Sequence, residues 1–93
     1  MGRRAAQRDA NEPEIVTALE AVGASVERLD AGPGGIPDLL VGYRGANYLL
    51  EVKTASGKLR RAQLTWHPEW RGQVSVVRTA EEAWAVIGAE AAV

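Results

Sequence analysis

Two short stretches near the middle of the chain carry the strongest structural signal. Residues 34–41 read GGIPDLLV and residues 49–53 read LLEVK, so each contains an apolar run. A short glycine-bearing link at residues 44–46 lies between them. This pattern predicts two strands, over 38–43 and 47–53, joined as a hairpin.

The predicted hairpin brings three charged side chains together. Antiparallel pairing places Asp38, at the start of one strand, beside Glu51 and Lys53, at the end of the other. Side chains alternate along a strand, so Glu51 and Lys53 share one face while Val52 points into the opposite layer. Two carboxylates suit Mg²⁺ or Mn²⁺, which prefer oxygen ligands. A lysine beside them can orient water or stabilise charge on a phosphate.

Upstream of the hairpin, the sequence predicts one helix and one strand. Asn11, followed three residues later by Glu14, has the spacing of a capping box. Apolar residues then recur at helical intervals until Gly23. Residues 24–29 are a predicted strand, and residues 30–37 are a loop because glycine and proline dominate them.

Downstream, the spacing changes twice more. A turn at 54–58 precedes a predicted helix. Four residues lie on the same face of this helix: Leu59, Gln63, Trp66 and Trp70. Pro68 disturbs this helix near its end. Residues 74–77 are a predicted strand.

The last predicted helix opens at a second capping box, Thr79 with Glu82, and buries Ala83, Trp84 and Ile87. The three tryptophans, Trp66, Trp70 and Trp84, are expected in the core. The order helix, three strands, helix, strand, helix predicts an α/β fold with a four-stranded mixed sheet flanked by helices. Because chains of this size are marginally stable alone, we expect a homodimer.

Composition bounds the function. The chain has 93 residues, of which 46% are hydrophobic and 25% charged, as in one small globular domain. It has no cysteine and one histidine, so disulfides, thiolate zinc sites and histidine-rich metal centres are excluded. No apolar run is long enough to span a membrane, and residues 1–10, expected to be flexible, do not resemble a secretory signal. We expect a cytoplasmic protein, with a bacterial or phage source.

Positive charge is concentrated in the middle of the chain. Residues 44–71 contain six basic and two acidic residues, although the whole chain has a net charge of −1. This asymmetry favours a local contact with an anionic partner.

The order and spacing of these motifs resemble the PD-(D/E)XK nuclease superfamily. Pro37-Asp38 followed by Glu51-Val52-Lys53 is similar to its active-site signature. The surrounding pattern, over residues 12–88, resembles its small members, the VRR-NUC nucleases and archaeal-type Holliday junction resolvases. The resemblance implies a restriction-endonuclease-like αβββαβα core and a metal-dependent phosphodiesterase.

The resemblance also implies roles for individual residues. Asp38, Glu51 and the backbone carbonyl of Val52 would bind Mg²⁺, with Mn²⁺ able to substitute, and Lys53 would contact the attacking water or the scissile phosphate. Relatives carry a glutamate early in the first helix, which Glu12 matches better than Glu14 does.

Gln63 interrupts an otherwise apolar helix face and is either satisfied by the backbone or part of the site. VRR-NUC-like sequences have a similar leucine-x-x-x-glutamine after the lysine strand, which favours the site. Basic side chains near it could bind DNA phosphates, and glycines before Asp38 could let a DNA backbone approach. The predicted DNA-binding residues are Lys58, Arg60, Arg61, Gly34 and Gly35.

The prediction is therefore a Mg²⁺-dependent DNA endonuclease acting on structured or double-stranded DNA. One alternative is an inactive DNA-binding module that retains the nuclease fold. Another is an interaction domain that uses the tryptophan-bearing helix as a partner surface. His67 is expected to have a packing or surface role.

Overall fold

The computed structural model describes residues 9–30 and 34–90. The predicted flexible segment 1–10 falls outside these residues, except for Asp9 and Ala10. The helices and strands, in chain order, are α1 (Glu12–Ala21), β1 (Ser25–Arg28), β2 (Leu39–Tyr43), β3 (Ala46–Val52), α2 (Arg61–Glu69), β4 (Ser75–Val77) and α3 (Ala80–Ile87). The predicted αβββαβα order is confirmed.

The four strands form one mixed sheet in the order β1-β2-β3-β4. β1, β2 and β3 are antiparallel neighbours, whereas β4 runs parallel to β3. A parallel pair needs a crossover connection, and the segment containing α2 provides it. In the hairpin, Leu39 pairs with Leu50, so Asp38 and Glu51 are adjacent across the two strands.

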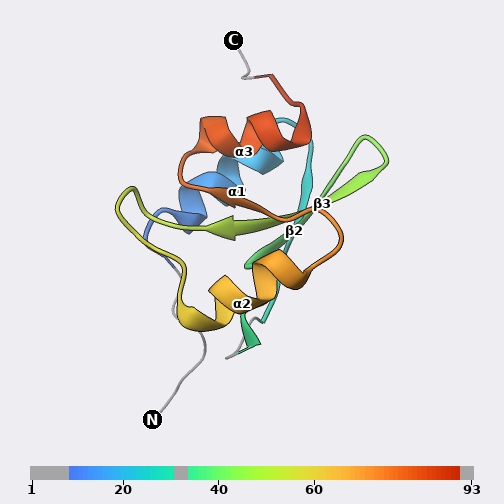
Figure 1. Ribbon diagram of the computed structural model, residues 1–93. Coiled ribbons are helices and arrows are strands. Elements are labelled where there is room, and N and C mark those ends of the chain that lie inside the picture. The colour runs from blue at the N-terminus through green and yellow to red at the C-terminus, as the bar shows by residue number, and fades with distance from the viewer. Residues whose placement is uncertain (1–8, 31–33, 91–93) are drawn as a thin grey trace.

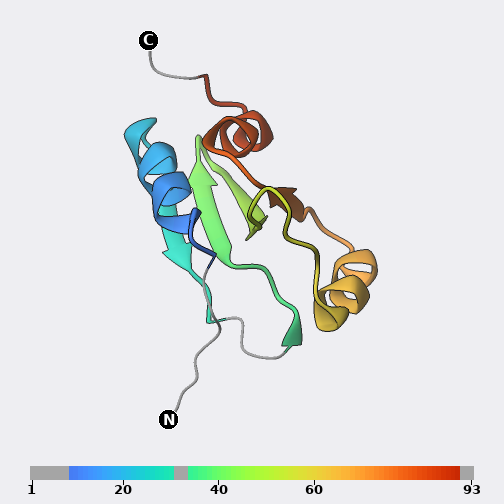
Figure 2. The ribbon, with the colours of Figure 1, turned by 90° about the vertical axis from the view of Figure 1, so that its left-hand side faces the viewer.

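The hydrophobic core lies between one face of the sheet and two helices. α1 and α3 lie side by side over this face, and α2 lies on the other side of the sheet (Figure 1). The turned view shows the sheet between α1 and α2 (Figure 2). The largest fully buried apolar side chains of this core are Ile15, Leu19, Leu39, Val41, Leu50, Val52 and Val77.

The predicted capping boxes are only partly present. Thr79 accepts a hydrogen bond from the Glu82 backbone at 3.1 Å, but the Glu82 side chain accepts from Arg78 N, not from Thr79 N. Asn11 occupies the N-cap of α1 without any side-chain capping bond. Its amide instead donates to two distant backbone carbonyls, those of Lys53 and Arg78. Long-range partners therefore replace the local cap that the sequence predicts.

The helix predicted from Leu59 differs most from expectation. α2 begins at Arg61, and Gln63 is its buried residue. Trp70 follows the helix in extended conformation, is 45% exposed, and stacks on the half-buried Trp66 with ring centroids 4.9 Å apart. The prediction that Trp66 and Trp70 belong to the core is therefore wrong. The reason is that the hydrophobic core lies on the other face of the sheet, against α1 and α3, and contains no residue of α2.

Trp84 is closer to its prediction. It is half-buried, packs against the edge of the core, and its indole N–H donates to the carbonyl of Ala18 in α1 at 2.8 Å. Ala83 and Ile87 are buried as expected.

None of the helices in residues 9–30 and 34–90 combines the length and the apolar character needed to cross a bilayer.

Candidate active site

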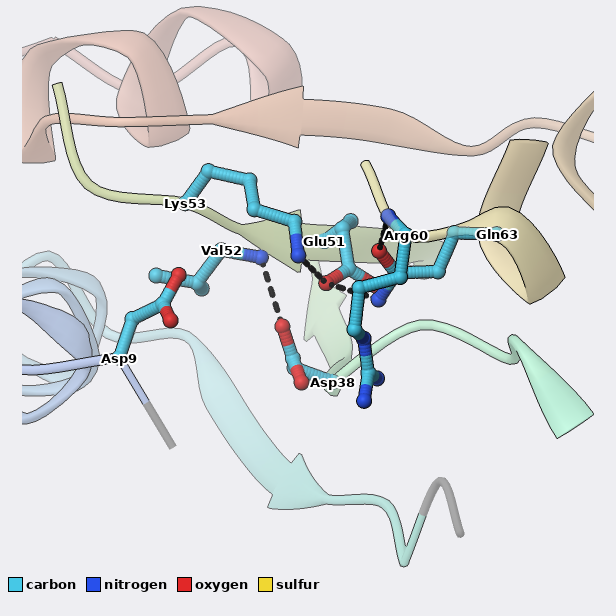
Figure 3. A pocket seen from close by; sticks show the side chains of 7 residues that line it. All are labelled: Asp9, Asp38, Glu51, Val52, Lys53, Arg60 and Gln63. Atoms are coloured by element: carbon cyan, nitrogen blue, oxygen red, sulfur yellow. Dashed lines mark hydrogen bonds and ion pairs between the residues drawn. The ribbon is translucent and has the colours of Figure 1, made fainter. Parts of the chain in front are cut away.

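A small polar cavity of about 130 Å³ lies where β2 begins and β3 ends. Figure 3 shows the side chains around it, which come from the hairpin and its ends, from the segment leading into α2, from α2 itself and from the start of the described chain. The lining residues are Asp9, Asp38, Glu51, Val52, Lys53, Arg60 and Gln63. Five of these seven are predicted catalytic or metal-binding residues, and Arg60 is a predicted DNA-binding residue.

The two predicted carboxylates meet because of the hairpin register. Asp38 lies just before β2, and one of its carboxylate oxygens, Oδ2, accepts a hydrogen bond from the backbone N–H of Val52 at 2.8 Å. In a strand, the N–H and C=O of one residue point to the same neighbouring strand. The carbonyl of Val52 therefore faces the same edge of β3 as Asp38, while its side chain lies in the core.

Glu51 occupies the centre of the site and is only 1% exposed. Its Oε2 accepts a hydrogen bond from Gln63 Nε2 at 2.8 Å and lies 3.5 Å from Lys53 Nζ (Figure 3). Its Oε1 is buried and has no hydrogen-bond donor among the described residues. One carboxylate oxygen is thus held by Gln63 and Lys53, whereas the other accepts no hydrogen bond within residues 9–30 and 34–90 and lies 4.0 Å from His67 Nε2.

Burial raises the pKa of Glu51 from its ordinary value of 4.5 to about 8. A hydrogen bond with Asp38 and the negative charge of Asp38 act in the same direction, and Lys53 partly opposes them. Two carboxylates this close, one buried and one half-buried, favour a shared proton or a cation between them.

Lys53 and Gln63 reach Glu51 from different segments. Lys53 follows β3, is 7% exposed, and its backbone N–H donates to Val77 of β4 at 3.0 Å. Gln63 lies in the first turn of α2, and its side-chain oxygen accepts from the Arg60 backbone at 2.8 Å. Both ends of the Gln63 amide are therefore bonded, which fixes its nitrogen against Glu51.

The structure places Glu12 apart from this cavity. Glu12 is 1% exposed and its Oε2 accepts from Arg28 Nε of β1 at 3.0 Å. Glu12 faces the interior, as predicted, and Glu14 is exposed. However, Glu12 does not line the cavity with the other predicted metal ligands.

Two residues near the site, His67 and Asp9, were not predicted from the sequence. His67 lies one turn after Gln63 on α2, and its Nε2 is 4.0 Å from Glu51 Oε1. Burial, and then the charge of Lys53, lower the pKa of His67. The four-residue spacing from Gln63 could have indicated this position. Asp9 lines the cavity through a contact between distant parts of the chain, for which the sequence has no local signal.

The predicted DNA-binding residues differ in exposure. Lys58, Arg60, Arg61 and Gly34 are exposed. Gly35 is buried with φ of +85°, and a Cβ there would lie 2.4 Å from the carbonyl oxygen of Ala62. Gly35 therefore allows the loop to pack against the start of α2, and its contact with DNA stays a prediction.

The donor set fits a hard divalent cation. No group of three or more acidic or histidine side chains within residues 9–30 and 34–90 could hold a metal ion by itself. Asp38 and Glu51 instead line one cavity together with Val52, whose carbonyl faces the same edge of β3 as Asp38, and Mg²⁺ typically combines one or two carboxylates with water. A cation would also remove the electrostatic penalty of ionising Glu51.

Fold and site together define a nuclease domain of the PD-(D/E)XK type. A solved structure described as a VRR_NUC domain matches the chain with a TM-score of 0.65 and 30% sequence identity. The match covers 86% of this chain and 97% of that one. The chain belongs to the VRR-NUC family. No protein-family model and no curated protein matches the chain.

Proposed function

We propose that this protein is a metal-dependent endonuclease that hydrolyses phosphodiester bonds in structured or double-stranded DNA. The observation that carries the proposal is the buried Glu51 carboxylate, with one oxygen held by Gln63 and Lys53 and the other without a donor. An ordinary structural ion pair has no need to leave a buried carboxylate oxygen unsatisfied.

Asp38, Glu51 and the carbonyl of Val52 would hold Mg²⁺ or Mn²⁺. When bound, such an ion polarises the phosphate and lowers the pKa of water. Gln63 would orient Glu51 by holding Oε2 in one position. Lys53 places a positive charge beside the carboxylates, where it can orient the attacking water or stabilise the charge that develops on the phosphate.

The exposed basic side chains that lead into α2 would bind the DNA backbone. Lys58, Arg60 and Arg61 lie in one short segment, and Arg60 also lines the cavity. Contacts of this kind position DNA without reading its sequence, and they weaken as salt rises. The predicted homodimer would present two such sites to two strands, and sedimentation equilibrium measures whether it forms.

The test is cleavage of four-way, flap, duplex and single-stranded DNA in Mg²⁺, Mn²⁺ or EDTA. The variants are Asp38→Asn and Glu51→Gln, with Glu20→Gln as the matched control, because Glu20 is exposed on α1. We expect cleavage by the wild-type and control proteins in Mg²⁺ or Mn²⁺ only, and none by the two site variants.

The inactive DNA-binding module gives a different result in the same assay. It would shift DNA in a gel but nick none of the substrates with either metal. Titration calorimetry with Mn²⁺ alone provides a readout independent of cleavage, and loss of binding in Glu51→Gln but not in Glu20→Gln would support the metal site.

A further inference from the structure

A tight turn directly follows Lys53 and leads towards α2. The backbone N–H of Gly57 donates to the carbonyl of Thr54 at 3.0 Å, which closes the turn over residues 54–57. A Cβ at position 57 would lie 3.0 Å from Thr54 Oγ1, so glycine suits this turn. Because Lys53 precedes the turn and Gln63 follows it, the position of the turn affects both side chains that contact Glu51.

The guanidinium of Arg78 holds this turn from outside. Arg78 directly follows β4, and its Nη1 donates to the carbonyls of Thr54 at 2.6 Å and Gly57 at 2.7 Å. A third carbonyl, that of Ala55, lies at 3.5 Å. Nη1 has two hydrogens, so the two short bonds use both of them. The two ends of the turn are thereby fixed to one rigid, permanently charged group.

The backbone of Arg78 is itself anchored. Its N–H donates to Glu82 Oε1 of α3 at 2.6 Å. Its carbonyl accepts a hydrogen bond at 2.9 Å from the side-chain amide of Asn11, which also donates to the carbonyl of Lys53 at 3.0 Å. Asn11 thus joins the backbones of Lys53 and Arg78, and three segments distant in sequence meet at the turn.

We propose that Arg78 is a positioning residue for the reaction, holding the 54–57 turn so that Lys53 and Gln63 meet Glu51 from two sides. This inference rests on the proposed function. Arg78 does not line the cavity, so it acts through the backbone of the turn and not on the substrate. Small displacements of groups that orient reacting atoms cause large losses of rate.

A purely stabilising role predicts something different. If Arg78 only added stability, its loss would lower the melting temperature but leave kcat unchanged in the protein that remains folded. Kinetics measured well below the melting temperature of each variant therefore separate the two roles. Hydrogen exchange at the Gly57 amide reports on the turn directly, because this amide closes it.

The experiment compares Arg78→Ala and Arg78→Lys with Arg44→Ala as the control. Arg44 is exposed and precedes β3, at the opposite end of that strand from Lys53. For Arg78→Ala we expect kcat to fall by about tenfold to a hundredfold, and Gly57 exchange to accelerate by at least about tenfold. Arg78→Lys should recover part of both losses, because an ammonium can still donate to the carbonyls. Arg44→Ala should change neither quantity.

Each other outcome has a defined meaning. A wild-type protein that cleaves DNA, with unchanged kcat in Arg78→Ala, overturns the positioning role even if Gly57 exchange accelerates. A wild-type protein that cleaves no DNA overturns the proposed function and the catalytic part of this inference together, while Gly57 exchange still decides whether Arg78 holds the turn. If Arg78→Ala does not fold, Arg78→Lys provides the test. A partial loss of kcat in Arg78→Lys would support the positioning role, and an unchanged kcat would overturn it.

Discussion

The two faces of the sheet use the same strand for opposite purposes. On β3, Leu50 and Val52 point into the apolar core beneath α1 and α3. Glu51 lies between them in the sequence and points to the other face, where it meets Lys53 and Gln63. Successive side chains along a strand point to opposite faces of the sheet. The same strand can therefore stabilise the core on one face and position the site on the other. The comparison shows that burial by itself does not mark a structural residue.

The largest expected effect comes from the polar face. Replacing Lys53 by methionine should lower kcat on the order of 10²–10³-fold. Removing one preorganised group that stabilises the charge developing in the transition state has about that effect. The matched variant Lys58→Met removes an exposed lysine beyond the turn and should mainly raise KM, by a few-fold at most. Steady-state kinetics of both variants test this difference between Lys53 and Lys58. Equal losses of kcat in the two variants would contradict it.

The core face should respond in stability instead. Leu50→Ala removes a fully buried side chain and should lower the free energy of unfolding by about 2–5 kcal/mol. Leu40→Ala, on the other face of β2, removes a side chain that is 36% exposed and should change stability by no more than about 0.5 kcal/mol. Urea denaturation measures both. Similar values for the two variants would mean that the faces do not differ as described.

The metal-free protein should become less stable as pH rises. The pKa of Glu51 is about 8 in the folded state and 4.5 when unperturbed, so the folded state retains a proton that the unfolded chain has released. The free energy of unfolding therefore falls between about pH 4.5 and 8. The pKa of His67 is lowered, so below about pH 6.5 the unfolded chain binds more protons at His67 than the folded state does. This residue therefore makes the free energy of unfolding rise with pH in that range.

Melting temperatures in EDTA across this range test the effect. Glu51→Gln should flatten the decline between about pH 4.5 and 8, and Mg²⁺ should restore the wild-type melting temperature most strongly at the alkaline end. An equal decline in Glu51→Gln would assign the pH dependence to another group.

The smallest effect on metal binding is expected at Glu12. Glu12→Gln weakens the contact with Arg28 and should lower stability by about 1 kcal/mol, because Arg28 is half exposed. Arg28→Ala should have a similar effect. Glu12 lies outside the cavity, so Mn²⁺ affinity should change less than about threefold, whereas loss of a ligand or its support typically costs tenfold or more. Calorimetry that finds such a tenfold loss would restore Glu12 as a metal ligand.

The sequence predicted the hairpin and the convergence at its end well, because both depend on local rules. Alternation along β3 and the glycine-bearing link at 44–46 determine which side chains meet Asp38. The same rules failed for α2. Its tryptophan spacing defines a helix face but not what that face meets, and here Trp66 and Trp70 pack on each other.

Long-range contacts account for the other differences. Asn11 has the sequence context of a helix cap, yet its amide binds carbonyls 42 and 67 residues away. Asp9 and His67 lie at the site because the folded chain brings distant segments together there. Gly35 was expected to face DNA because glycine is permissive, but the same permissiveness serves its close approach to Ala62.

The most direct measurement is anomalous diffraction from crystals soaked in Mn²⁺, for the wild-type protein and Glu51→Gln. We expect one strong peak in the wild-type crystals, in contact with carboxylate oxygens of Asp38 and Glu51 and with the carbonyl of Val52, and no peak there in the variant. Either of two results would contradict this metal site. One is a peak elsewhere, and the other is a cavity in which the side-chain ammonium of Lys53 takes the place of the ion beside the two carboxylates.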